Sequence, residues 1–153
     1  MEYITLNNQV KMPILGLGTF ILEPDDAQAA VECALANGYE LIDTANAYVN
    51  EKAVGRGNTV ILDEPVIAEL AAKYGKAPAQ VIMRWQVQEG NVVIPGSKTP
   101  AHIAENIDVF DFELTDAEMA QISALDKGKP FYVRTDEALA GFAAWHPDVE
   151  GQK

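Results

Sequence analysis

The first fifty residues alternate between apolar and amphipathic segments, and this order constrains the fold more than any other feature. Residues 14–20 form an apolar run with two glycines, which predicts a buried strand. Pro24 then begins a predicted helix with Asp25 and Asp26 in its first turn, and residues 40–43 form the next predicted strand. This order predicts a βαβ unit whose two strands pair in parallel.

Local patterns define the other elements of this first part. Residues 3–6 and 10–12 flank the turn-prone pair Asn7-Asn8, which predicts a short β-hairpin. Gly38 stands where a left-handed residue would end the predicted helix. The apolar stripe of that helix, which we expect to be buried, consists of Ala27, Ala30, Val31, Ala34 and Leu35.

Helical patterns dominate the chain after residue 57. Residues 91–94 form one short apolar strand among them, and a polar loop follows at residues 95–100. We expect a single domain over 1–153, with a first βαβ part (1–57), the last helices and final strand (58–125) and a C-terminal tail (126–153). The predicted helices run from Pro65 to Gly75, from Pro78 to Gly90, from Pro100 to about Asp108, and onward from the capping-box sequence Thr115 to Glu118.

Charge and cysteine content exclude several classes of function. The net charge of −12 argues against a nucleic-acid or anionic-membrane binder, and no apolar run approaches the ~20 residues of a membrane span. We expect no signal peptide, and the single Cys33 cannot form an internal disulfide, so we expect a reducing, cytoplasmic setting. His102 and His146 lack a metal-ligand spacing, and we expect no metal site.

A carboxylate and a phenol follow the second predicted parallel strand. Asp43 ends that strand, and Tyr48 lies in the loop just beyond it. Tyrosine has a pKa of about 10, so a neighbouring cation would have to lower that pKa before Tyr48 could donate a proton at neutral pH. An anion such as Asp43 would hold that cation in place. A capping Asp beneath a packing Tyr explains the same spacing, and spacing alone favours this second interpretation.

The polar loop before the helix at Pro100 is a second candidate site. Free amides at a helix N-terminus bind phosphate, and Ser97, Lys98 and Thr99 could add hydroxyls and a cation. An ordinary strand-to-helix loop explains these residues equally well. The chain contains neither the GxGxxG nor the GxxxxGK[ST] phosphate-binding motif.

Taken together, the segments resemble the aldo-keto reductase family, in particular its bacterial 2,5-diketo-D-gluconate reductase-like members. Residues 41–48, Leu-Ile-Asp-Thr-Ala-Asn-Ala-Tyr, with Gly38 before them, resemble the family signature, and residues 12–20 resemble its opening strand. Further resemblance lies in residues 74–85, 93–98, 105–106 and 110–114.

The resemblance implies a (β/α)8 barrel that reduces small aldehydes and ketones with NADPH. It implies that Asp43 and Tyr48 are two of four catalytic residues, with Tyr48 as the proton donor. Gly18 and Thr19 would line the nicotinamide end of the cofactor. The residues implied at its adenosine end are Ser97, Lys98, Thr99, His102, Glu105 and Asn106.

The chain departs from the family in length. A (β/α)8 barrel needs about 250 residues, whereas this chain has 153 and only about three barrel-type strands, near Leu15, Ile42 and Val93. By resemblance these are the first, second and last strands, which are neighbours around a closed barrel, and the family's catalytic Lys and His lie in the missing middle. We therefore expect a partial barrel whose reductase activity is weak or lost.

Two further expectations follow from these departures. The family has a Lys and an Arg for the 2′-phosphate where this chain has Gly96 and His102, so we expect weakened NADP(H) binding. A homo-oligomer would cover the open edges of a three-stranded sheet. The alternatives to a reductase are a non-catalytic nucleotide-binding or self-assembling module, and a folded remnant without function.

Overall fold

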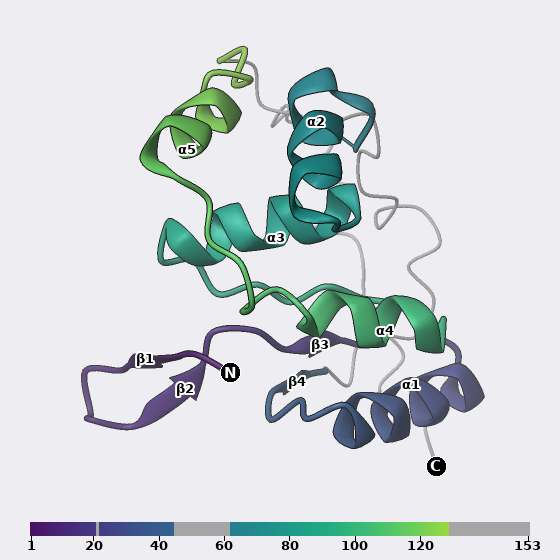
Figure 1. Ribbon diagram of the computed structural model, residues 1–153. Helices are drawn as coiled ribbons and strands as arrows, with labels where there is room; N and C mark the ends of the chain where they lie inside the picture. The colour runs from purple at the N-terminus through teal and green to yellow at the C-terminus, as the bar shows by residue number, and fades with distance from the viewer. Residues whose placement is uncertain (21, 45–61, 129–153) are drawn as a thin grey trace, which may run out of the picture.

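Three parallel chain segments and five helices organise the structure, a computed structural model that describes residues 1–20, 22–44 and 62–128 (Figure 1). The elements, in chain order, are β1 (Tyr3–Thr5), β2 (Lys11–Pro13), β3 (Leu17–Gly18), α1 (Pro24–Ala36), β4 (Ile42–Asp43), α2 (Pro65–Tyr74), α3 (Pro78–Gln88), α4 (Pro100–Ile107) and α5 (Asp116–Ser123).

Strand β3 lies between two parallel neighbours. On one side it pairs with β4, so that Leu17 faces Ile42 and Gly18 faces Asp43. On the other side, parallel bridges join Leu15 to Val93 and Gly18 to Gly96. The segments near Ile42 and Val93 thus flank the segment near Leu15, and the predicted order of three neighbouring barrel strands is confirmed.

The third segment is less regular than the predicted strand over residues 91–94. It pairs only through isolated bridges at Val93 and Gly96. Pro95 lies between them and has no N–H to donate, which interrupts a continuous ladder. Its carbonyl nevertheless accepts a hydrogen bond of 3.1 Å from the Gly18 N–H.

The predicted hairpin is confirmed at the N-terminus. β1 and β2 pair antiparallel, with Ile4 opposite Met12. The side chain of Asn8 accepts a hydrogen bond from the Val10 N–H at 3.2 Å, and Gln9 takes a left-handed φ of 69°. Asn side chains favour such turns because they replace a backbone acceptor.

Helix α1 buries a narrower stripe than the sequence predicts. Ala30 and Ala34 are buried, and Val31 packs partly exposed against the same core cluster. Leu35, which was predicted to share the stripe, is 59% exposed. The prediction was wrong for Leu35 because α1 rests on its neighbours through alanines, and small side chains make a contact strip narrower than the helical pattern suggests.

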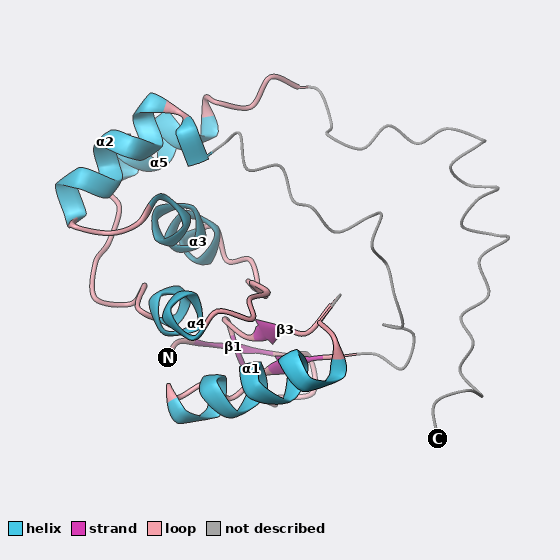
Figure 2. Cartoon of the chain, turned by 90° about the vertical axis from the view of Figure 1, so that its right-hand side faces the viewer, coloured by secondary structure: helices cyan, strands magenta, loops and turns pink. Residues whose placement is uncertain are grey.

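Two hydrophobic clusters meet at α3. The first surrounds β3, α1 and α4, and the second joins α2, α3 and α5. Met83 of α3 belongs to the first cluster and Val81 to the second. Figure 2 shows α3 between the α2–α5 pair and α4.

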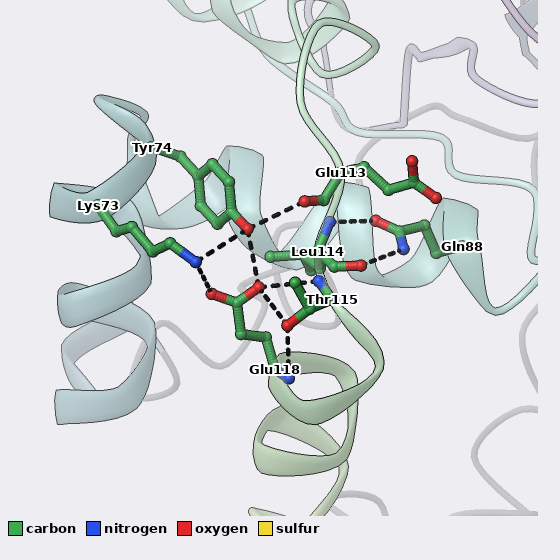
Figure 3. Close-up of polar contacts among 7 residues, drawn as sticks. All are labelled: Lys73, Tyr74, Gln88, Glu113, Leu114, Thr115 and Glu118. Carbon is green, nitrogen blue, oxygen red and sulfur yellow. Dashed lines mark hydrogen bonds and ion pairs between the residues drawn. The ribbon is translucent and has the colours of Figure 1, made fainter.

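The capping box at the start of α5 also connects α5 to α2 (Figure 3). Thr115 accepts a hydrogen bond from the Glu118 N–H, and the Glu118 carboxylate accepts one from the Thr115 N–H at 2.8 Å. The same carboxylate accepts a hydrogen bond from the Tyr74 hydroxyl at 2.7 Å and is ion-paired with Lys73, both on α2. Burial alone would raise the pKa of Glu118, but the hydrogen bonds from Lys73, Thr115 and Tyr74 outweigh it and hold the pKa at about 2.

We expect Glu118→Gln to lower the stability of the fold at neutral pH. Because the carboxylate has a lower pKa in the folded chain than in the unfolded one, its contribution is fully present above about pH 5 and is lost as pH falls toward 2. The expected loss at pH 7 is on the order of 2 kcal/mol, since water around the half-exposed Lys73 screens part of the interaction.

Urea denaturation at pH 7 and at pH 3 measures this loss. The matched control is Glu113→Gln, because Glu113 contacts the same cluster only through its backbone carbonyl, which accepts from Tyr74 at 2.9 Å. An equal loss in both variants, or a loss for Glu118→Gln that grows toward low pH, would contradict the expected role of Glu118.

We expect Gly16→Val to destabilise the sheet by about 1–3 kcal/mol, because a side chain there overpacks the contact with Leu41. A Cβ atom on Gly16 would lie 2.7 Å from Leu41 Cγ and 2.9 Å from the Leu41 carbonyl oxygen. Thermal unfolding measures the effect, with the exposed hairpin variant Thr5→Val as a control expected within about 0.5 kcal/mol of wild type. Equal melting temperatures for the two variants would contradict this contact.

Candidate functional site

The carboxyl ends of the three parallel segments meet at one cleft of about 330 Å³. Asp43 ends β4, and its backbone carbonyl accepts hydrogen bonds from the Thr19 N–H at 3.0 Å and from the Thr19 hydroxyl at 2.9 Å. Ligands of parallel α/β sheets and barrels bind at this end of the strands. The cleft is lined by Gly18, Phe20, Leu22, Asp43, Ile94, Gly96 and Ser97.

Glycines form the tightest contact at the edge of this cleft. A Cβ on Gly96 would lie 3.2 Å from the Gly18 carbonyl oxygen, and one on Gly18 would lie 3.1 Å from the Ile94 carbonyl oxygen. The two segments therefore meet backbone to backbone, and both glycines line the cleft. Such bare backbone lets a flat ligand approach closely.

The loop after the third segment joins the cleft to α4. The Ser97 hydroxyl oxygen accepts a hydrogen bond from the Thr99 N–H at 3.1 Å. Thr99 is the N-cap of α4 but makes no side-chain capping hydrogen bond. Lys98 points to α1 instead, where its ammonium donates to the Asp26 carboxylate at 3.0 Å.

Helix α4 carries the remaining residues predicted for the adenosine end. His102 and Glu105 are exposed, and Asn106 is partly exposed. The structure therefore brings Gly18, Asp43 and Ser97 into one cleft, with Thr19 hydrogen-bonded to Asp43 beside it. Lys98, Thr99, His102, Glu105 and Asn106 follow in the loop and along α4 and do not line that cleft.

Two buried polar side chains fix α4 in place. The Gln80 amide of α3 donates to the Glu105 carbonyl at 2.9 Å and to the Asp108 carbonyl at 2.8 Å, while its oxygen accepts from the Ala77 N–H. The Tyr39 hydroxyl donates to the Ile103 carbonyl at 3.0 Å, and burial raises the pKa of Tyr39 to about 12, so it stays protonated at neutral pH.

Sequence reasoning missed Gln80, because apolar periodicity ignores polar residues on a buried face. One local signal could have indicated part of its role. Gln80 stands three residues after the N-cap Ala77, the position from which a Gln side chain reaches back to the N-cap amide. Its two hydrogen bonds to α4 have no such local signature.

The described lysines do not gather at the mouth of the strands. Lys73 is ion-paired with Glu118, Lys76 with Asp108 and Asp111, and Lys98 with Asp26. Tyr48, the predicted proton donor, lies outside the described residues, as do Lys52 and His146.

A second hollow of about 410 Å³ lies between α1 and β4 and is lined by Thr19, Ala27, Gln28, Val31, Glu32, Ile42 and Thr44. Within residues 1–20, 22–44 and 62–128, His, Cys, Asp and Glu side chains form no group of three that could hold a metal ion. None of the described helices combines the length and the apolar character needed to cross a membrane.

Comparison with known proteins gives sequence and structural matches. A sequence model of the Aldo/keto reductase family matches residues 61–127. Methylglyoxal reductase DkgA of Escherichia coli is 50% identical over 76 residues, which cover 50% of this chain and 28% of that protein. Aldo-keto reductase family 1 member A1 of Homo sapiens is 50% identical over 74 residues, which cover 48% of this chain and 23% of that protein.

Among solved structures, a mutant of Gox0644 in complex with NADPH is similar with a TM-score of 0.75 at 19% identity. That alignment covers 86% of this chain and 96% of the Gox0644 chain. This likeness concerns the fold, and together with the three parallel segments and the N-terminal hairpin it shows a partial (β/α)8 barrel.

The sequence matches add to the likeness of the fold, but they cover only part of each relative. The chain spans only about a quarter of the length of the two curated relatives that it matches at 50% identity. Its match to the family model lies in the part that holds α2 to α5 and the loop after the third segment. Through this match, these relatives and this fold, the chain is similar to the aldo-keto reductase family, with the sequence likeness concentrated in residues 61–127.

Proposed function

We propose that the chain descends from carbonyl oxidoreductases, binds NADP(H) weakly at the carboxyl end of its three strands, and reduces aldehydes and ketones slowly or not at all. The observation that carries the proposal is the cleft that Asp43, Gly18 and Ser97 line together. By the family resemblance, these residues come from the catalytic set, the nicotinamide end and the adenosine end.

The form of the cleft supports nucleotide binding. A flat ring could pack against the glycines at the edge of the cleft and against its apolar side chains, which are those of Phe20, Leu22 and Ile94. The loop that begins at Ser97 leads from the cleft to the N-terminus of α4, where main-chain amides favour phosphate. The similar Gox0644 structure is an NADPH complex, and we extend that cofactor to this chain as a proposal.

Charge explains why the binding is weak. Gly96 and His102 occupy the positions where the family has a Lys and an Arg for the 2′-phosphate. Lys98, the nearby cation, is ion-paired with Asp26, and the chain as a whole carries a net charge of −12. An anionic cofactor therefore meets less positive potential here than the family pattern supplies.

The missing middle of the barrel predicts weak catalysis at Tyr48. A tyrosine with a pKa of about 10 needs a neighbouring cation to donate its proton at neutral pH. The family's Lys and His belong to the missing middle, and Lys73, Lys76 and Lys98 are ion-paired with carboxylates away from the cleft. A nucleotide-binding module without turnover is the second candidate function, favoured by the loop and helix α4, which the chain retains.

The cysteine content supports a location for this chain. Cys33 is the single cysteine and is partly exposed on α1. A thiol that cannot pair within its own chain suits a reducing compartment, so we propose the cytoplasm.

A fluorescence titration with NADPH, followed by an assay of NADPH oxidation with methylglyoxal, tests the proposed function. We expect saturable binding, with an oxidation rate at least about a hundredfold below that of an intact family member, because general acid catalysis contributes roughly 10²–10⁴-fold. We also expect Tyr48→Phe and Asp43→Asn to change the residual rate less than about twofold.

The control is Tyr3→Phe, since the Tyr3 hydroxyl donates to Glu40 on the protein surface. Rapid oxidation that Tyr48→Phe abolishes, while Tyr3→Phe preserves it, would overturn the proposed loss of acid catalysis. Binding without oxidation supports the nucleotide-binding module, and absence of binding would overturn both candidate functions.

We also propose that a second copy of the chain covers the open edges of the sheet. Among the described residues, no further strand pairs with the outer edge of β4 or of the segment at 93–96, and Ile94 is 41% exposed there. Unpaired strand edges and exposed apolar side chains favour association.

Light scattering at micromolar concentration is expected to show a dimer or a larger oligomer. Thr44→Lys places a charge at the end of β4 and is expected to shift the protein toward the monomer, because charged side chains oppose edge pairing. Thr5→Lys, on the hairpin, is the matched control. A monomeric wild type would rule out this assembly.

A further inference from the structure

An ion pair of Lys98 with Asp26 joins the loop at 97–99 to helix α1. The two side chains lie 3.0 Å apart and are 66% and 41% exposed. Asp26 belongs to the first turn of α1, and α1 packs against α4, the helix that follows the loop. Both views of the chain show these two helices side by side (Figures 1 and 2).

Lys98 is flanked by the two residues that shape the loop. Ser97 before it lines the cleft, and Thr99 after it is the N-cap of α4. A cation at this position contributes positive potential to whatever anion binds the loop, but a carboxylate in contact cancels most of it. Since the pair is exposed and in high dielectric, it is weak enough for a bound phosphate to compete with Asp26.

Resting on the proposed function, we propose that Asp26 is a specificity-determining residue that competes with the 2′-phosphate of NADPH for Lys98. When the nucleotide is absent, Asp26 holds the Lys98 ammonium toward α1. Its negative charge also repels the phosphate directly. Asp26 therefore lowers the affinity for NADPH more than the affinity for NADH, which lacks that phosphate.

If this competition is removed, we expect tighter NADPH binding. A misfolded variant could not show such a gain in affinity. Asp26→Asn keeps the shape of the side chain but releases Lys98. We expect it to tighten NADPH binding about threefold to fivefold, in line with a surface ion pair, and NADH binding less than about twofold. The gain should shrink at 0.5 M salt, because the Debye length falls to a few ångströms there.

The adjacent carboxylate provides a matched control. Asp25 lies in the same first turn of α1, carries the same charge and has a similar relation to the helix dipole. Asp25→Asn therefore measures the general effect of one fewer negative charge, which we expect to stay below about twofold. A second control places Asp26→Asn in a Lys98→Ala background, where the gain should fall to the Asp25→Asn level.

Fluorescence titrations with NADPH and NADH on the full chain decide between the outcomes. A gain specific to Asp26→Asn and dependent on Lys98 supports the inference. Equal gains from Asp25→Asn and Asp26→Asn, or a gain that persists in the Lys98→Ala background, would overturn it while the proposed nucleotide binding stands. A wild type and an Asp26→Asn variant that both fail to bind NADPH would overturn the proposed function itself.

Discussion

The backbone N–H groups of residues 16 to 19 alternate between two neighbours, and the candidate site depends on this double pairing. Gly16 and Gly18 donate to the carbonyls of Val93 and Pro95, while Leu17 and Thr19 donate to those of Leu41 and Asp43. A strand that is paired on both sides has no room for a side chain where a neighbour lies close. Gly16, which has no side chain, fits beside Leu41 for this reason. The pairing places Asp43 and Ser97, distant in sequence, at one cleft.

Helix α3 holds the second half of the chain in register with this sheet. Its Gln80 amide binds the end of α4, and its Gln88 amide exchanges two hydrogen bonds with the backbone of Leu114 just before α5. Both glutamines replace backbone partners that a loop or a helix end would otherwise lack. The adenosine end of the proposed site is therefore anchored by α3 and by Tyr39, without help from the strands that the family has in the middle.

Local chemistry made much of this fold predictable. Proline at the first turn and glycine after the last turn marked α2 and α3 closely, and Thr115 with Glu118 marked α5, because these signals act within a few residues. The order of the parallel segments came from the family resemblance. Three features were not predictable from the sequence, because each depends on which helix lies opposite. They are the exposure of Leu35, the hydrogen bonds from Gln80 to α4, and the ion pair of Asp26 with Lys98.

The two ends of the proposed cofactor site depend on different parts of the chain, and this separates binding from chemistry. The loop at 97–99 and α4 are fixed by α1 and α3, which are all present. By the family resemblance, proton donation by Tyr48 would depend instead on residues of the strands in the missing middle. The contacts that hold α4 come from Tyr39 and Gln80, which this chain retains. Under the proposed function, nucleotide binding therefore persists without the reaction, and its selectivity depends on the charges around Lys98.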